Sequence, residues 1–222
     1  SHFVSVLGDV NGDGVPDVYA SDWKDGANGS TSGRVYVHSG ADGKRLWTRA
    51  GERPGDGFGI GNARAGDVDG DGLADLIVGS WIASAVAPRA GKATLLRGTD
   101  GAVLRAWTCT REGATFGYDA TGLGDVDGDG HPDFLVSGAD DNDQRGTVWV
   151  LAGRPVDPGD GDAAAGSPSP GVASELAAAR QLMGGEEQER AAELVGGRVG
   201  RETDNAEGWY LYGYALQAGG GV

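Results

Sequence analysis

The sequence contains one cysteine, three histidines and no long apolar run among its 222 residues. One cysteine excludes an intrachain disulfide framework. Cys109 has no second cysteine and no histidine partner in a motif, so we interpret it as a small buried apolar residue. No apolar run approaches the roughly 20 residues of a membrane-spanning helix. A nucleophile elbow, a phosphate-binding loop and a zinc-ligand spacing are also missing, so we expect the chain not to be an enzyme.

Basic residues are scarce as well. The chain has 18 lysine and arginine residues against 33 aspartate and glutamate residues, which gives a net charge of −15. Nucleic-acid binding needs a basic stripe that neutralises phosphates, and attraction to an anionic membrane also needs positive charge. We therefore expect neither nucleic acid nor a membrane surface as a partner.

Much of the acidic excess lies in three loops that begin at Asp9, Asp67 and Asp125, each 58 residues after the one before. Every loop has an aspartate or asparagine at positions 1, 3, 5 and 9 and glycine at positions 4 and 6. Four side chains converge on one cation only if the backbone turns sharply, which glycine permits. With a carbonyl at position 7, the oxygens approach the roughly 6 to 8 that Ca²⁺ prefers. The loops therefore predict three calcium sites.

Two alternatives to this interpretation need consideration. An EF-hand loop shares the opening but requires a glutamate at position 12 and a helix on each side; position 12 here holds Ala20, Val78 or Val136, each within a β-type segment. The other alternative is a solvated turn rich in aspartate and glycine that binds no ion. Three copies in register favour calcium loops between strands.

The repeat extends beyond the loops. Phe58-Gly59 and Phe116-Gly117 precede the second and third loops, again 58 residues apart. Asp42-Gly43 and Asp100-Gly101 are hairpin turn signals between β-type segments. Each period thus predicts about four short strands, the content of a propeller blade rather than of a two-sheet sandwich.

These motifs resemble FG-GAP repeats, the blades of integrin alpha-subunit propellers and of many bacterial secreted proteins. The resemblance covers residues 1–153, with Gly79-Ser80 and Gly138-Ala139 in place of the Gly-Ala-Pro signature. It implies a mainly β fold, a partial β-propeller of about three four-stranded blades. It also implies calcium ions in loops between adjacent strands that stiffen the blades.

When the ligand positions of the family are carried over to this sequence, the resemblance implies five ligands in each loop. The residue at position 7 would bind through its backbone carbonyl. The predicted ligands are Asp9, Asn11, Asp13, Val15 and Asp17; Asp67, Asp69, Asp71, Leu73 and Asp75; and Asp125, Asp127, Asp129, His131 and Asp133. The first loop is predicted to bind most weakly, because the neutral Asn11 replaces a charged ligand and ligand charge tunes affinity.

The amino-acid composition changes after residue 153. Residues 154–171 are rich in proline and glycine and predict a linker. Residues 172–222 are rich in helix formers. Trp209, Gly213 and Leu216 in this segment resemble the signature of a tetratricopeptide repeat, here truncated; a helical hairpin unrelated to that family is the alternative.

The resemblance implies a calcium-binding, integrin-alpha-like scaffold for adhesion or binding, extracellular or at the cell surface. The ligand would be a protein or a glycan. The alternative is a non-catalytic accessory propeller of a larger secreted hydrolase or lyase. The sequence starts at Ser1 without a signal peptide, and three blades do not close a propeller. We therefore expect a fragment that missing blades, self-association or a partner would complete.

Overall fold

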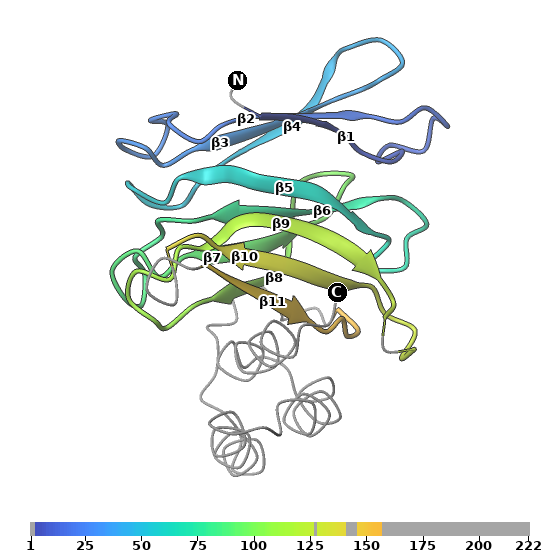
Figure 1. Ribbon diagram of the computed structural model, residues 1–222. Coiled ribbons are helices and arrows are strands. Elements are labelled where there is room, and N and C mark those ends of the chain that lie inside the picture. The colour runs from blue at the N-terminus through green and yellow to red at the C-terminus, as the bar shows by residue number, and fades with distance from the viewer. Residues whose placement is uncertain (1–2, 127, 141–145, 157–222) are drawn as a thin grey trace.

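The computed structural model describes residues 3–126, 128–140 and 146–156, which form eleven strands in three antiparallel sheets (Figure 1). The first sheet contains β1 (Phe3–Val6), β2 (Val18–Asp22), β3 (Arg34–His38) and β4 (Arg45–Ala50). The second contains β5 (Phe58–Gly66), β6 (Asp75–Ser80), β7 (Lys92–Leu96) and β8 (Val103–Thr108). The third contains β9 (Phe116–Gly124), β10 (Asp133–Gly138) and β11 (Thr147–Leu151).

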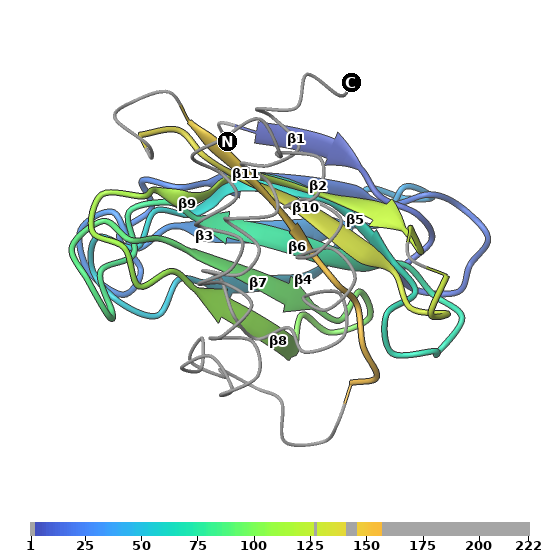
Figure 2. The same ribbon diagram turned by 60° about the horizontal axis from the view of Figure 1, so that its bottom comes forward.

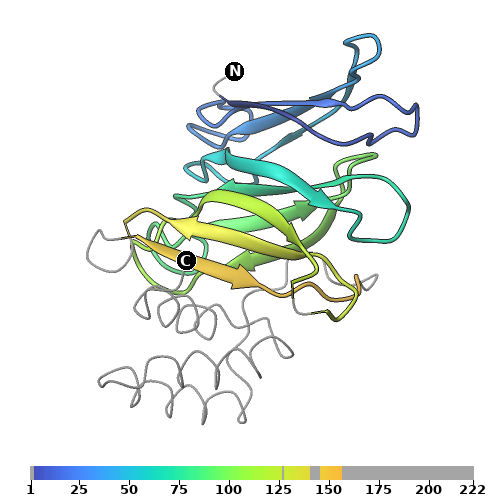
Figure 3. The same cartoon turned by 45° about the vertical axis from the view of Figure 1, so that its right-hand side comes forward.

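Consecutive strands pair with each other in every sheet, so each sheet is a meander of hairpins. The sheets stack face to face (Figures 1 and 3), and β5, the first strand of the second sheet, contacts both β1 of the first sheet and β9 of the third. Figure 2 shows β4 and β8, the last strands of the first two sheets, on the side away from β1. This arrangement is consistent with consecutive blades of an incomplete β-propeller.

The predicted strand count is confirmed for the first two blades, whereas the described part of the third blade has three strands. Within the described residues, no helix is long and apolar enough to span a lipid bilayer. The predicted tetratricopeptide-like segment, 172–222, lies outside the described residues, as does the predicted linker beyond residue 156.

The core lies between the sheets, in two clusters. Strand β6 contributes to both because all six of its residues are buried. Leu76 and Val78 belong to the cluster shared with the first sheet, whereas Ile77 belongs to the cluster shared with the third. Successive side chains of a strand point to opposite faces. The continuous apolar run of β6 therefore reflects a strand covered on both faces.

The Phe-Gly pairs lie where one blade meets the next. Phe58 and Phe116 are buried, and their backbones form isolated parallel bridges with Gly33 and Gly91 of the preceding blade. The Phe116 amide also donates to the Ala90 carbonyl at 3.0 Å. A Cβ atom on Gly33 or Gly91 would overlap the phenylalanine backbone. The repeated glycine thus permits a close backbone contact between neighbouring blades.

We expect Gly91→Ala to destabilise the contact between the second and third blades. Gly91 has a φ of +90°, and the added methyl group would collide with Phe116. The free energy of unfolding should fall by about 2 kcal/mol or more, measured by urea denaturation. Gly26→Ala is the control, because its Cβ would meet only the Gly29 carbonyl oxygen, 3.7 Å away. Equal stability of the two variants would contradict the role given to Gly91.

Candidate metal centre

Each acidic loop joins the first two strands of its sheet: β1 to β2, β5 to β6 and β9 to β10. The predicted placement between adjacent strands is therefore confirmed. Figure 1 shows all three loops at the same, right-hand end of the sheets. The loops have nearly the same internal hydrogen bonds, so their shape follows from the repeated residues.

The aspartate at position 1 holds the turn of each loop. The Asp9 carboxylate accepts hydrogen bonds from the amides of Gly12, at 2.7 Å, and Gly14, at 2.8 Å. Asp67 and Asp125 accept the equivalent pairs of glycine amides. Both glycines of the first loop have a φ of +81°, as the predicted sharp turn requires. The bonds, led by that from Gly14, hold the pKa of Asp9 below its ordinary value.

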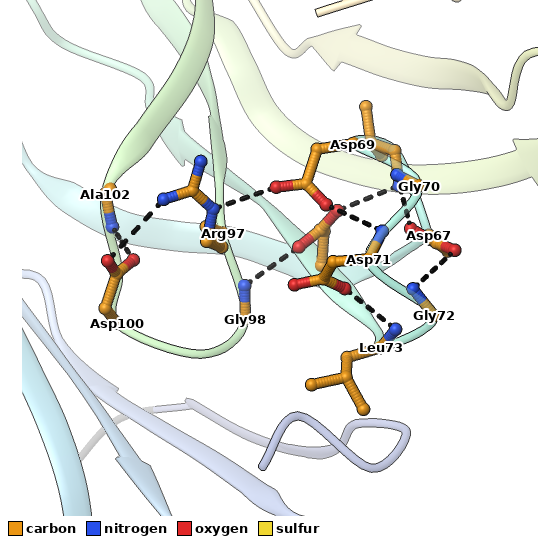
Figure 4. A network of polar contacts seen from close by, with 12 residues as sticks. Asp67, Asp69, Gly70, Asp71, Gly72, Leu73, Arg97, Gly98, Asp100 and Ala102 are labelled. Atoms are coloured by element: carbon orange, nitrogen blue, oxygen red, sulfur yellow. Dashed lines mark hydrogen bonds and ion pairs between the residues drawn. The ribbon is translucent and has the colours of Figure 1, made fainter. Parts of the chain in front are cut away.

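The second loop brings three of its predicted ligands together. Asp67, Asp69 and Asp71 each place a carboxylate oxygen within 4.8 Å of the others. Figure 4 shows the three side chains on this loop. Two oxygens that share one calcium ion lie at most about 5 Å apart, and carboxylates are the hard oxygen ligands that calcium prefers. The donor set and its spacing therefore fit calcium. In the third loop, Asp127 lies outside the described residues.

In every loop, the backbone amide of the residue at position 7 forms a hydrogen bond that fixes the position of this residue. The amides of Val15, Leu73 and His131 each donate to the position-5 carboxylate at 2.8 Å. This bond tightens the second half of the loop. Ligation by the carbonyls of these residues stays a prediction.

The aspartate at position 9 has a structural role that the sequence analysis did not identify. Asp75 is buried, and its two oxygens accept the amides of Val68, at 2.8 Å, and Gly98, at 2.9 Å. Val68 belongs to the same loop, whereas Gly98 lies in the turn between β7 and β8. Asp75 is also outside the cluster of three carboxylates. Its contacts clamp the acidic loop to a neighbouring turn.

The same clamp recurs in the other blades. Asp17 accepts the amides of Val10 and Gly40, and Asp133 accepts those of Val126 and Gly153. Gly40 and Gly98 are 58 residues apart, so their spacing was a signal in the sequence. A Cβ atom on any of the three turn glycines would overlap the position-8 carbonyl. Glycine is required there because the turn packs directly on the loop.

Burial sets the protonation of the clamp in the second blade. It raises the pKa of Asp75 to about 6, in spite of the two backbone hydrogen bonds. The nearby negative charges of Asp69 and Asp71 raise it further. A divalent cation in the loop would favour the ionised carboxylate and so lower this pKa.

An unpredicted arginine contacts the second loop. The Nε atom of Arg97, which directly follows β7, is 2.8 Å from Oδ2 of Asp69 (Figure 4). The same guanidinium lies 3.6 Å from the carboxylate of Asp100. The second loop thus combines three clustered carboxylates with one fixed positive charge.

Cys109 is buried, as predicted. Burial raises the pKa of its thiol, which disfavours the nucleophilic thiolate. His131, at position 7 of the third loop, is partly exposed.

We expect Asp17→Asn to destabilise the protein even in the presence of a chelator. Asparagine offers one oxygen where two backbone amides need an acceptor, so one buried N–H group loses its partner. The free energy of unfolding should fall by about 2 kcal/mol in EDTA. Asp13→Asn is the control, because Asp13 is an exposed residue of the same loop. If Asp17 acted only as a metal ligand, both variants would melt like the wild type in EDTA.

Comparison with known proteins gives matches along most of the described chain. An FG-GAP-like repeat model matches residues 6–78 and an FG-GAP repeat model matches residues 116–151. Integrin alpha-4 of Xenopus laevis is 30% identical over 130 residues, which is 55% of this chain, and integrin alpha-PS2 of Drosophila melanogaster is 35% identical over 166 residues, which is 69%. The chain spans 12% of the length of each of these relatives. The predicted resemblance to FG-GAP repeats is therefore confirmed for the blades.

Solved structures that match include two rhamnogalacturonan lyases. Lyase YesW aligns with a TM-score of 0.42 at 19% identity, over 67% of this chain and 31% of the lyase. A Bacillus licheniformis lyase aligns with a TM-score of 0.43 at 19% identity, over 68% of this chain and 32% of the lyase.

Proposed function

We propose that this chain of FG-GAP repeats is a calcium-binding propeller segment that acts outside the cell as a non-catalytic binding scaffold. The observation that carries the proposal is the cluster of Asp67, Asp69 and Asp71, whose oxygens have the mutual spacing of calcium ligands. The similarity to integrin alpha subunits supports the scaffold role and the extracellular setting.

Calcium would relieve the electrostatic repulsion within the second loop. Carboxylates held within 4.8 Å of one another repel, and the loop glycines impose little resistance to opening. A cation held by position 1, 3 and 5 side chains, with the position-7 carbonyl, offsets this repulsion. Position 9 would complete the site while it keeps the loop clamped to its turn. Calcium suits this arrangement better than magnesium because it accepts more oxygens in less regular geometry.

The opposite end of the blades offers a surface for a protein or glycan partner. Trp23 follows β2 and Trp81 follows β6, so both lie away from the acidic loops. Trp81 contacts Trp23 and Tyr118 edge to face, with ring centroids 6.0 Å and 5.6 Å apart. Tyr118 is 43% exposed. Partly exposed aromatic side chains from three successive blades are typical of binding surfaces.

We expect the chain to take up three Ca²⁺ ions and to melt at a higher temperature with calcium than with EDTA. A ligand that binds only the folded state adds about 2.7 kcal/mol of stability for each site at a concentration of 100 times its Kd. Isothermal titration calorimetry measures the number of ions, and differential scanning calorimetry measures the shift. Magnesium at the same concentration is the control. No calcium uptake, with melting unaffected by EDTA, would refute the proposal.

The third loop distinguishes a side-chain ligand from a backbone ligand. We expect His131→Val to keep all three ions, because position 7 would bind through its carbonyl and the first loop already has Val15 there. Asp129→Ala should lose one ion, because it removes a carboxylate ligand. The ion count by calorimetry checks both variants. Similar losses in the two would show that the histidine ring contributes to the site.

A further inference from the structure

We infer that the positive charge of Arg97, held beside Asp69, lowers the calcium affinity of the second loop and stabilises that loop when calcium is absent. The inference rests on the proposed calcium binding. Its basis is the ion pair between Arg97 Nε and Asp69 Oδ2, at 2.8 Å. The Asp69 side chain is only 12% exposed, so solvent screens this pair less than an ordinary surface pair.

Both oxygens of Asp69 are already occupied. Oδ2 accepts the Arg97 guanidinium, and Oδ1 accepts the Asp71 amide at 3.2 Å. A calcium ion that uses Asp69 as a ligand must displace the guanidinium from Oδ2 or share the carboxylate with it. In either case a cation is held beside the entering divalent cation, and the two repel.

The arginine is a feature of the second blade. Gly40, Gly98 and Gly153 occupy equivalent places, because each donates to the position-9 aspartate of its own blade. The residue before this glycine is Arg97 in the second blade, but Ser39 and Ala152 in the first and third. Neither serine nor alanine carries a charge to the loop.

This arrangement changes the ranking of the loops by charge. From the sequence, the first loop has one carboxylate fewer than the second, because Asn11 stands at the position of Asp69. Arg97 offsets the charge of Asp69, so the two loops have the same net charge once it is counted. We therefore expect no affinity advantage for the second loop over the first.

Without calcium, the same contact has the opposite effect. Asp67, Asp69 and Asp71 lie close together and repel, and the guanidinium is the positive charge that reduces this repulsion. Asp100, whose Oδ2 atom lies 3.6 Å from Nη1 of Arg97, also favours this position of the guanidinium. Arg97 should thus keep the second loop formed under conditions in which the metal is removed.

The test is Arg97→Ser, which gives the second blade the residue found in the first. We expect the Kd of the second site to fall roughly tenfold, measured by calorimetric titration. In EDTA the melting temperature should fall, so the stabilisation by calcium becomes larger. Arg97→Gln, which keeps the length of the side chain without its charge, should behave in the same way, and Arg97→Lys should stay near the wild type.

Two controls assign the effect to the second loop. Arg34→Ser removes the same charge and a similar ion pair, 3.1 Å from Asp25, at the start of β3; it should leave every calcium affinity unchanged. In an Asp71→Ala background, which removes a ligand of the second site, Arg97→Ser should not alter the remaining affinities.

A wild-type chain that takes up no calcium refutes the proposed function. If the wild type binds calcium, but Arg97→Ser and Arg97→Gln bind with unchanged affinity, the inference is wrong. That conclusion holds even if both variants have a lower melting temperature than the wild type, because Arg97 would then have a structural role only.

Discussion

The structure depends on a buried carboxylate that bonds to two backbone amides from different parts of a blade. Burying an aspartate is costly unless its oxygens find donors. Asp17, Asp75 and Asp133 each find one amide in their own loop and one in the turn between the third and fourth strands, or after the third strand in the last blade. The bond holds an acidic, glycine-rich loop against that turn. This contact therefore also determines where the carboxylates at positions 1, 3 and 5 lie.

The contact that joins neighbouring blades is also repeated, at both junctions between the three blades. Each new blade begins with a buried phenylalanine whose backbone pairs with a glycine of the blade before it. The second sheet has a neighbour on both faces and is the most buried, whereas β1 exposes Val4 and Val6, which are 70% and 72% accessible. Repeats of this kind bury their apolar faces by stacking on neighbours. The first sheet, which has a neighbour on one face only, therefore leaves more of its apolar side chains exposed.

The acidic character of the chain has a local cause. The loops place like charges close together, which a folded chain tolerates only when hydrogen bonds or cations offset the repulsion. Backbone amides supply the first compensation at position 1, and Arg97 supplies a second in one loop. The two loops whose side chains are fully described thus share a backbone and a net charge but reach that charge differently, through the neutral Asn11 in the first loop and through Arg97 beside Asp69 in the second.

The sequence by itself determined the features that depend on neighbouring residues. The 58-residue period, the β character of the blades, the turn glycines at positions 4 and 6, and the location of the loops between strands all follow from local pattern. Only the tertiary structure decided which distant groups meet. Asp75 bonds to Gly98, 23 residues away, and Asp69 pairs with Arg97, 28 residues away, because the turn after β7 folds onto the loop after β5. The spacing of the aspartates does not encode that packing, since it arises from the way the hairpins of a blade lie side by side.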